Sequence, residues 1–488
     1  STAMYGSHTI TLLTDGAVAR VRVNQGSFSK TYNADGNRVV LDGLPGGIED
    51  LRITVLYLTK PYRRAHIKRV YFGTCEIYSG RDVTSLSYSD CNDAIYLDAP
   101  EKAVTIGIDN LPGRYDPDKE TANPQYRQWY TQALIYVTQG KYTIPLGRLY
   151  MYDYTVNDSE VVFTFKGALS VLMDCIYKYG KLGTQTAINI FKHILHPDLG
   201  LTPIDTDEPI LSGAEQYGIS YHISYATSKN ILLPVPVVPE GQAIQLLCNL
   251  TGNCIAQGRT PRDISTDQNY DLWIIPLSLC IDEDYIIKEK YNYGSPEWEA
   301  GDKIGEITAD VYNLQAATDT VTLLDKMRLN VGYASGVESE DVLEQITVPS
   351  SSDGQAYPLL LSKFAHSAYY TAQNDSYYTP TPVTATVHKM QKTTKTLKKR
   401  DGKRMSISNP LLAEDNNGSV DDYLDAMYEE LQYHRCCTIY HRGYPHLDAG
   451  QKIHIELGGK TRWCRILENK ITIKNGAMRG QTKVRVLE

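Results

Sequence analysis

The chain has 488 residues, of which 42% are hydrophobic and 22% are charged. This is an ordinary globular composition, and it excludes a collagen-like, coiled-coil or wholly disordered chain. The formal net charge of −8 gives no general attraction to nucleic acid or anionic lipid. No apolar run approaches the roughly 20 residues that cross a bilayer. Ser1-Thr2-Ala3 before Met4 resembles a cloning remnant and no signal peptide follows, so synthesis in the cytoplasm is expected.

The first third of the chain is predicted to consist of short β-strands separated by turns. Ala17 to Val23 alternates apolar and polar residues, which is typical of a strand with one buried face. Further strands are expected at Leu51 to Leu58 and at Val161 to Lys166. Turn-forming residues such as those at 33–36 separate these elements.

The middle of the chain has a mixed pattern. Helices are expected from Ala168 to Tyr179, after a cap at Thr184, and from Gly241 to Leu250, where Gly252 can end the helix in the left-handed conformation. A strand is predicted at Leu272 to Leu277. This part is therefore predicted to be a smaller α+β unit.

The last third returns to a β pattern with one amphipathic helix. Strands are predicted at Ile304 to Val311 and at Thr320 to Leu324. Ser419 is placed to cap the helix. Strands then follow to the C-terminus, at residues 453–457, 463–467, 471–474 and 484–487. No repeat of fixed period is present, which argues against propellers and solenoids.

Tyrosine outnumbers phenylalanine by 37 to 6. A tyrosine combines apolar area with a polar tip, so it suits half-exposed strand faces and interfaces better than a deep core. Pairs such as Tyr369-Tyr370 and Tyr377-Tyr378 are expected to serve in sheet packing or subunit contact, with sugar binding as the alternative.

No motif marks a catalytic or metal site. His193 and His196 lie one helical turn apart, but the metalloprotease glutamate is missing, and a helix C-terminus favours histidines without a metal. The acidic clusters 205–208 and 282–284 are expected to be solvated loops, because glycosidase chemistry needs a spatial separation that sequence spacing cannot establish. Cys437, placed at the end of the C-terminal helix, carries no sign of an activated thiol. The nine cysteines lack a C-x-x-C pair and are expected to be reduced. We predict no catalytic residue, metal or cofactor.

The strongest charge feature is the run from Lys389 to Arg404, which holds eight basic residues and one acidic residue, Asp401. It is expected to be a solvated, partly mobile loop, and contact with an acidic partner is the functional alternative. No aromatic residue is interleaved with it, so a base-stacking platform is absent. The candidate contact residues of this basic loop are Lys389, Lys392, Lys395, Lys398, Lys399, Arg400, Lys403 and Arg404.

Three stretches carry a resemblance to a known family. They look like the patterns D-N-x-x-G-x-Y-x-P, P-x-G-x-F and P-x-L-x-x-G-D-x-I, and they stand at 109–117, 145–149 and 445–453. Because these stretches follow one another in the same order, the chain resembles the tail hub proteins of phages and prophages. That family includes the baseplate hub of contractile tails and the N-terminal part of tail-associated lysins. Two positions depart from the family pattern: Lys166-Gly167 replaces an acidic residue before the segment 168–172, and Gln451 replaces an aspartate.

The resemblance implies a homotrimer in which two β-barrel-like domains per chain form a pseudo-hexameric ring. The fold class it implies is a β-rich α+β multidomain protein, with two β-barrel-like hub domains, an inserted small α+β domain and a C-terminal helix-plus-strands unit. The expected divisions are an N-terminal β segment at 1–60, the first hub domain at 61–173, the insert at 174–302 and the second hub domain at 303–488.

The function that the resemblance implies is structural. The chain is expected to be made in the host cytoplasm and assembled into a virion tail or phage-like particle, where its ring joins the tail tube to the distal spike or fibre. Expected partners are its own copies and tail tube, distal tail, and tape-measure or spike proteins, without a membrane span or specific nucleic-acid binding. No enzymatic activity is expected, because the sequence ends at Glu488 where the hub would end. The alternatives are a cell-wall hydrolase that uses carboxylates of 174–302, and a carbohydrate-binding adhesin.

Overall fold

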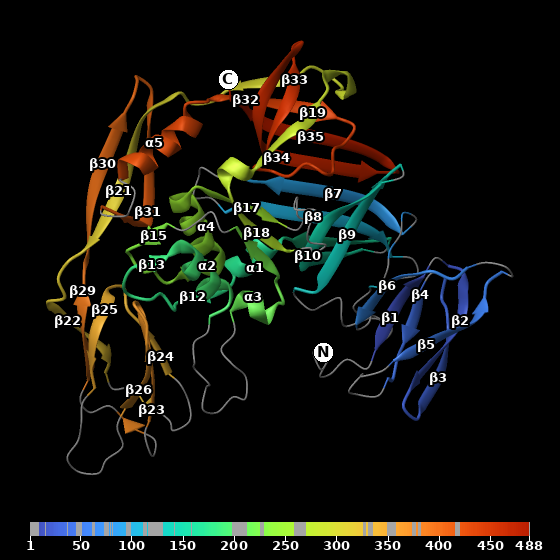
Figure 1. Cartoon of the computed structure of the whole chain (residues 1–488), viewed down its shortest axis with the longest axis horizontal. Helices are drawn as coiled ribbons and strands as arrows, with labels where there is room; N and C mark the ends of the chain where they lie inside the picture. The colour runs from blue at the N-terminus through green and yellow to red at the C-terminus, as the bar shows by residue number, and fades with distance from the viewer. Residues whose placement is uncertain are drawn as a thin grey trace. The chain divides into compact units, whose positions relative to one another are not determined.

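A computed structural model divides the chain into two units, residues 1–82 and 83–488. Figure 1 labels the elements of both units. The structure describes residues 9–487 with the exception of 15, 37, 45–50, 61–63, 73–77, 79, 81, 94–98, 111–114, 116–129, 141, 158, 198–211, 225–228, 258–269, 326–327, 330–334, 349–357, 373–376, 379–381 and 415–419.

The first unit consists of two three-stranded antiparallel sheets among its described residues, with the orders β4-β1-β6 and β3-β2-β5. The predicted alternation is confirmed in β2, where Val18, Val21 and Val23 are buried while Arg20 and Arg22 are exposed. These valines share a core with side chains of the other sheet. The strands are β1 (Ile10–Thr14), β2 (Val18–Gln25), β3 (Phe28–Asn33), β4 (Arg38–Leu41), β5 (Arg52–Leu58) and β6 (Ile67–Phe72).

The second unit contains a sheet of eleven described strands. Its main path has the order β20-β32-β35-β34-β7-β8-β11-β10-β9, while β33 pairs with β34, and β19 pairs with β33. The strands are β7 (Val83–Cys91), β8 (Glu101–Asp109), β9 (Gln132–Gln139), β10 (Tyr142–Val156), β11 (Glu160–Lys166), β19 (Ile281–Ile287), β20 (Glu297–Ala300), β32 (Arg435–His441), β33 (Lys452–Leu457), β34 (Lys460–Lys474) and β35 (Ala477–Val486).

This sheet joins the two ends of the unit through one long strand. The first part of β34 pairs with β33, in the register Lys460 opposite Leu457, and its second part pairs with β7, in the register Ile471 opposite Tyr88. A register irregularity between Ile466 and Glu468 marks the point at which the partner changes. Ile471 is 1% exposed and packs in the core formed by β7 to β10. The residues of β34 therefore complete a core that the first strands of the unit begin.

A buried polar network lies where β34 changes its partner. The side-chain amide of Asn469, which is fully buried, donates to the carbonyl oxygens of Tyr444 at 3.1 Å and Leu447 at 3.0 Å, and its Oδ1 accepts from the Thr482 hydroxyl at 3.0 Å. Nearby, Arg485 is paired with Asp93 at 2.5 Å. Because buried polar groups are costly unless they are hydrogen-bonded, this network favours the observed register over shifted ones.

The three family-like stretches coincide with irregular backbone. Asn110 accepts from the amide of Tyr115 at 3.0 Å and so closes the loop after β8. Gly147 has φ +124° at a register shift between β9 and β10. Gly450 has φ +87°, and a Cβ there would lie 2.8 Å from the Cys254 sulfur. At these two glycines a side chain would strain the backbone.

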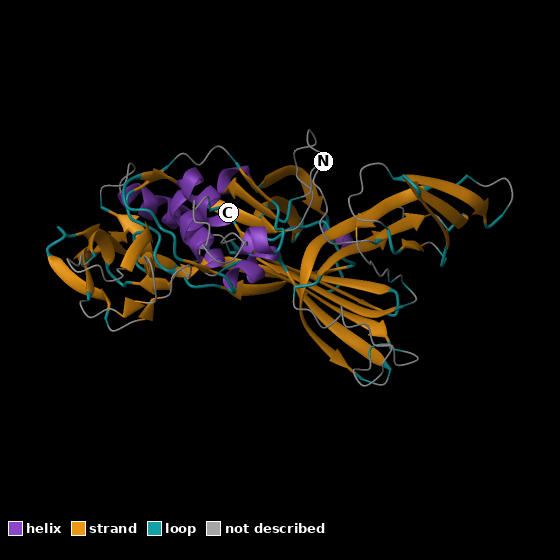
Figure 2. Ribbon diagram, turned by 90° about the horizontal axis from the view of Figure 1, so that it is seen from below, coloured by secondary structure: helices purple, strands orange, loops and turns teal. Residues whose placement is uncertain are grey.

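Most helices pack in one group, which Figure 2 shows in purple. The helices α1, α2, α4 and α5 share one hydrophobic core with β21 and β31. As predicted, α4 ends at Gly252 in the left-handed conformation, with φ +67°. The helices are α1 (Ala168–Met173), α2 (Ala187–Leu195), α3 (Gly213–Gln216), α4 (Glu240–Thr251) and α5 (Val420–Leu431), with 3-10 turns η2 (Leu277–Leu279) and η3 (Glu289–Tyr291).

Two predicted helices differ from the structure in their bounds. The helix expected to reach Tyr179 ends at Met173, because Ile176–Tyr177 pairs as β12 with β16. The cap of α2 is Thr186, not Thr184, because Gln185–Thr186 pairs as β13 with β15. In both places a short strand pairing with a distant segment overrides local helix propensity. The predicted cap Ser419 lies outside the described residues.

The remaining strands form small sheets in the described part of the unit. Their orders are β12-β16, β13-β15, β14-β18-β17, β30-β21-β31, β22-β29-β25, β23-β28 and β24-β27-β26. The strands are β12 (Ile176–Tyr177), β13 (Gln185–Thr186), β14 (Tyr221–Ile223), β15 (Asn230–Ile231), β16 (Val238–Pro239), β17 (Asn253–Gln257), β18 (Leu272–Pro276), β21 (Ile304–Leu314), β22 (Asp319–Leu324), β23 (Arg328–Leu329), β24 (Ser335–Glu338), β25 (Val342–Thr347), β26 (Pro358–Lys363), β27 (Ser367–Ala372), β28 (Tyr377–Tyr378), β29 (Val383–His388), β30 (Met390–Lys398) and β31 (Lys403–Ala413).

The predicted β-rich α+β multidomain fold is confirmed. The sheets formed by the described strands are open, and none of them closes into a barrel.

Replacing Asn469 with Ala is expected to destabilise the second unit strongly. The substitution removes three buried hydrogen bonds at once, and each contributes about 0.5–1.5 kcal/mol. We expect a loss of about 3 kcal/mol in the free energy of unfolding, measured in urea. Thr461→Ala, at an exposed position of the same strand, is the control and should change stability by less than about 0.5 kcal/mol. Equal stability of the two variants would contradict the role assigned to the network.

Candidate functional site

The basic run does not form the predicted loop. Residues 390–398 form strand β30, a tight turn follows at 399–402, and β31 begins at Lys403. Three threonines, Thr393, Thr394 and Thr396, favour the extended backbone because their branched side chains suit a strand. The expectation of a mobile loop was therefore wrong, because the lysines were weighed by charge alone.

Most of the basic side chains are neutralised by acidic residues of the same chain. Lys392 pairs with Asp310 at 3.4 Å, Lys398 with Asp401 at 3.4 Å, and Arg404 with Glu306 at 3.4 Å. The remaining ion pairs are Lys389 with Asp319, Lys399 with Asp425, and Lys403 with Asp302. Since β21 lies between β30 and β31, its acidic residues stand between two basic strands.

Two basic residues of the run have other surroundings. Arg400 donates to the backbone carbonyls of Ile304 at 3.1 Å and Gln432 at 2.9 Å, so it ties the turn to the end of α5. Lys395 is half-buried opposite Ala309, and no ion pair to it is found within the described residues. The run is thus a charge-compensated sheet, and Lys395 is its one basic residue for which neither an ion pair nor a side-chain hydrogen bond is found within the described residues.

Hydrogen bonds between side-chain hydroxyl groups also connect β21 and β31 on the outer face of this sheet. Thr308 and Ser406 are 3.0 Å apart, and so are Tyr312 and Ser408, measured between their hydroxyl oxygens. Glu306, on the same face, stands between Lys398 and Arg404 in the register. Ser406 and Ser408 are exposed whereas Thr308 is buried, so the hydroxyl groups of this face are hydrogen-bonded within the sheet.

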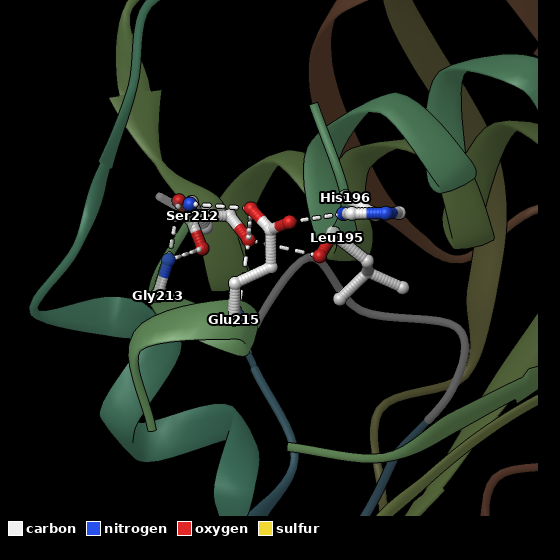
Figure 3. Close-up of polar contacts among 6 residues, drawn as sticks. Leu195, His196, Ser212, Gly213 and Glu215 are labelled. Carbon is white, nitrogen blue, oxygen red and sulfur yellow. Dashed lines mark hydrogen bonds and ion pairs between the residues drawn. The ribbon is translucent and has the colours of Figure 1, made fainter. Parts of the chain in front are cut away.

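A second candidate lies between α2 and α3, where two carboxylates are held close to one backbone turn. Ser212 and Glu215 form a capping box: the Ser212 hydroxyl accepts from the Glu215 amide at 3.2 Å, and the Glu215 carboxylate accepts from the Ser212 amide at 3.0 Å. The same carboxylate pairs with His196. Figure 3 shows Glu215 pointing toward both Ser212 and His196.

Glu240, the first residue of α4, completes this cluster. Both of its carboxylate oxygens lie 3.0 Å from the Gly213 amide, which donates to them. Glu240 is 3% exposed, and burial raises the pKa of its carboxyl group to about 7, with the nearby Glu215 adding to the rise. Glu240 was not predicted from the sequence, because the helix was expected to begin at Gly241 and no local pattern marks a buried carboxylate.

A raised carboxyl pKa beside a second carboxylate is the arrangement that a hydrolase uses for its acid and base. Here, however, Glu215 is bonded to Ser212 and His196, and Glu240 is bonded to Gly213. Both groups satisfy the first amides of α3, which a helix start leaves without intrahelical partners. The two carboxylates therefore cap the N-terminus of α3, and Ser212, Glu215 and Glu240 together are called the α3 cap cluster. The acidic cluster 205–208 lies outside the described residues, and the side chains of 282–284 are likewise not described.

The histidines and cysteines considered from the sequence have separate partners. His193 lies 2.8 Å from the Tyr177 hydroxyl, whereas His196 contacts Glu215. Within the described ranges no three His, Cys, Asp or Glu side chains could hold a metal ion together. Cys437 lies in β32 and not at the end of α5 as predicted, and burial raises its thiol pKa to about 11. A thiol with that pKa carries almost no thiolate at neutral pH.

The tyrosine pairs have different positions. Tyr369 and Tyr370 lie in β27 with 7% and 0% exposure, which confirms their assignment to sheet packing. The side chains of Tyr377 and Tyr378 are not described. Among the described helices, none has the length and apolar character that crossing a bilayer requires.

The chain was compared with known proteins. No protein-family model and no curated protein matches it. Among solved structures it is similar to the 43 kDa tail protein of a Shewanella oneidensis prophage, with 8% identity and a TM-score of 0.43 over 85% of this chain and 95% of that one. It is also similar to a tail protein from Neisseria meningitidis (9%, TM-score 0.43, 83% and 92% covered) and to a prophage tail protein from Listeria monocytogenes (10%, TM-score 0.40, 86% and 91% covered).

These similar structures are all tail proteins. The resemblance seen in the sequence names the same class of protein. The identities are at most 10% and the TM-scores are below 0.5 in all three cases, so the likeness is distant. The function has to be inferred from the residues of this chain.

The charge-compensated sheet has a testable energetic signature. Glu306→Gln removes the ion pair with Arg404, and exposed pairs of this kind contribute about 0.5–1 kcal/mol. We expect that loss at low salt, and we expect it to vanish at 1 M NaCl, where the Debye length is about 3 Å. Lys395→Gln is the matched control, with a change below about 0.5 kcal/mol at either salt concentration. A loss independent of salt would contradict the electrostatic interpretation.

The α3 cap cluster predicts that the free energy of unfolding depends on pH. The ordinary glutamate pKa is 4.5, and that of Glu240 is raised to about 7. Its stability contribution is therefore fully present below about pH 4.5 and is lost as the pH rises through about 7. Glu240→Gln keeps an acceptor oxygen but cannot ionise, so its stability relative to the native chain should rise by about 2–3 kcal/mol between pH 4 and pH 8. Urea unfolding at both pH values measures this difference.

The control for the pH experiment is Glu429→Gln, at an exposed position of α5. We expect no such rise there, because that side chain is solvated in the folded and the unfolded chain. A Glu240→Gln variant that behaves like this control would show that burial does not disfavour the ionised form of Glu240.

Proposed function

We propose that the chain is a structural component of a phage or prophage tail, in which three copies form a hub ring that joins the tail tube to the distal spike or fibre. The observation that supports this most is the pairing of β7 with β34. It places two groups of about five strands side by side in one chain, the first from residues 83–166 and the second mainly from 435–486. Three such chains would supply six strand groups, as a pseudo-hexameric ring requires.

The domain divisions of this proposal are those of the family resemblance. Residues 61–173 and 303–488 are the two hub domains, which become barrel-like only in the assembled ring, and 174–302 is the insert between them. The N-terminal segment 1–60 precedes the first hub domain. The proposed partners are the tail tube, the distal tail, and tape-measure or spike proteins.

Composition is consistent with such an assembly. Obligate interfaces bury 2,000 Å² or more, and tyrosine is among the residue types enriched in interfaces. The 37 tyrosines of this chain supply such surface. A net charge of −8 per copy would also repel DNA that passes through the ring, so the DNA would slide without being bound.

The basic strand is proposed as a contact for a tail partner, with Lys395 as the cation that is not compensated by a described ion pair. The other seven basic residues already have acidic or carbonyl partners in the chain. A partner that binds here would have to compete with those pairs, so the contact should weaken as salt is raised. Loss of that salt dependence in Lys395→Gln would support the contact, and its persistence would contradict it.

The chain is further proposed to act without catalysis. This rests on Glu215 and Glu240, the two closely placed carboxylates of the insert, which are both bound to backbone amides. A turbidity assay with peptidoglycan tests the hydrolase alternative: a steady suspension is expected, and clearing that disappears in Glu240→Gln would overturn the proposal.

The trimer is tested by the absolute mass in solution, measured by light scattering after size exclusion. One chain has a mass of 54.7 kDa, and three times this value is 164.1 kDa. We expect a peak at the trimer mass and, in negative stain, a ring with a central hole. A stable monomer at every concentration tested would contradict self-assembly of the ring.

A further inference from the structure

The main path of the eleven-stranded sheet ends in a short, exposed strand. Strand β20 pairs only with β32 in the described part of the chain, and all four of its residues, Glu297 to Ala300, are exposed. The preceding residues run along the same edge, since the Tyr293 amide donates to the carbonyl of Tyr440 at 2.9 Å. An unpaired strand edge presents a row of free backbone donors and acceptors to another chain.

The register shows which backbone groups face away from β32. Gly301 donates to the His434 carbonyl at 2.8 Å, and Ala300 stands opposite Arg435. Because hydrogen-bonded and non-hydrogen-bonded pairs alternate in an antiparallel ladder, the amide and carbonyl groups of Ala300 and Trp298 point to the open side. These groups are spaced to pair with an added extended strand.

Large hydrophobic side chains are concentrated on this edge. Of the thirteen that are exposed within the described residues, three lie between positions 291 and 298: Tyr291 at 51%, Tyr293 at 41% and Trp298 at 52%. Tryptophan and tyrosine are the residue types that most often dominate binding energy in interfaces. Tyr291 is the last residue of the 3-10 turn η3, and Tyr293 and Trp298 follow along the free edge. A single exposed aromatic residue needs no explanation, but two along one free edge favour a covered surface.

A cavity of about 340 Å³ opens beside this strand. It is lined by Trp298, Glu299, Ala300, Arg435, Arg462 and Val486. The one acidic side chain, Glu299, is already paired with Lys483 at 2.6 Å. Arg435 is exposed, and no ion pair to it is found in the part of the chain that the structure describes. The cavity therefore combines an apolar wall with the exposed guanidinium group of Arg435, which suits a side chain with an apolar stem and a carboxylate end.

We propose that the β20 edge, defined as residues 291–300 with this cavity, binds an extended acidic segment of another protein as an added β-strand. Backbone pairing to Trp298 and Ala300 supplies affinity, and a carboxylate bound by Arg435 supplies specificity. Alternate residues of the added strand point to the other face of the sheet, where Glu297 disfavours acidic groups. The segment that fits therefore carries its acidic side chains at every second position. This binding does not depend on the trimer proposed above.

The test uses two fluorescein-labelled peptides and the full chain. One peptide, fluorescein-TEVET-amide with the label on its N-terminal amine, carries glutamates at alternate positions, and the other, fluorescein-TKVKT-amide labelled in the same way, carries lysines in their place. In fluorescence anisotropy titrations at low salt, we expect the glutamate peptide to bind at least ten times more tightly than the lysine peptide. Similar affinity for the two peptides, or no binding of either, would overturn the proposal.

Three substitutions separate the components of the site. Trp298→Ala should weaken binding of the glutamate peptide at least tenfold, and Arg435→Gln should remove most of the preference for glutamate over lysine. Ala300→Pro removes an amide that faces the open side and leaves the ladder to β32 intact, because proline is tolerated at such edge positions. It should weaken both peptides. Tyr142→Ala, at a 64% exposed tyrosine of β10, is the matched control and should bind like the native chain.

The mass of each variant in solution, measured without peptide, tests whether a second copy of this chain covers the edge in place of an acidic segment. If Trp298→Ala dissociates an assembly that the native chain forms, the edge is covered by a second copy, and the proposal of an acidic partner strand is overturned. If the native chain is a monomer and still binds the glutamate peptide selectively, the edge proposal stands while the proposed trimer fails. Thermal melting of each variant confirms that the chain remains folded.

Discussion

The fold of the second unit depends on one strand that serves two different partners. β34 has fifteen residues, and it is paired with β33 in its first part and with β7 in its second, while β35 follows its other side. The hydrogen bond from the Cys91 thiol to Glu468 joins residues 377 positions apart. Such a pairing is costly in loop-closure entropy, so local propensity alone cannot produce it. It needs a core that neither group of strands completes by itself, and Ile471 contributes to that core.

Burial alone does not determine where β34 changes its partner. From Lys470 to Lys474 its residues alternate between polar and apolar, and a shift by two positions would keep the same face buried there. The buried polar groups distinguish the observed register from one shifted by two positions. Asn469 binds two specific carbonyl groups, and Arg465, 3% exposed, binds Glu430 of α5 at 2.6 Å. These partners come from two parts of the chain, α5 and residues 444–447, so a shifted strand would leave several buried groups unsatisfied at once. The network therefore acts more on the choice of register than on the total stability.

Local sequence patterns predicted much of the fold, and they failed where distant segments decide the outcome. The strand at Val161 to Lys166 and the stop at Gly252 follow from alternation and from glycine conformation, and both are observed. The family-like glycines Gly147 and Gly450 stand where a positive φ is required, which explains why short motifs could indicate the fold class. By contrast, the strand formed by the basic run depends on acidic residues of β21, more than 80 positions earlier in the chain. No local pattern shows that neighbour.

The basic strand and the β20 edge differ in how far the sequence indicates each of them. Charge marked the run 389–404 from the sequence, yet its ion pairs lie within the chain, so little of its charge is available to a partner. The β20 edge carried no signal in the sequence, because Glu297 to Ala300 is too short for a periodic pattern and its exposure follows from its end position in the sheet. Residue charge alone would therefore favour the basic strand over the β20 edge as a surface for a partner. A surface is available for assembly when its hydrogen bonds and charges are unsatisfied within the chain, and by this criterion the open edge at Trp298 is better suited to a partner than the basic strand.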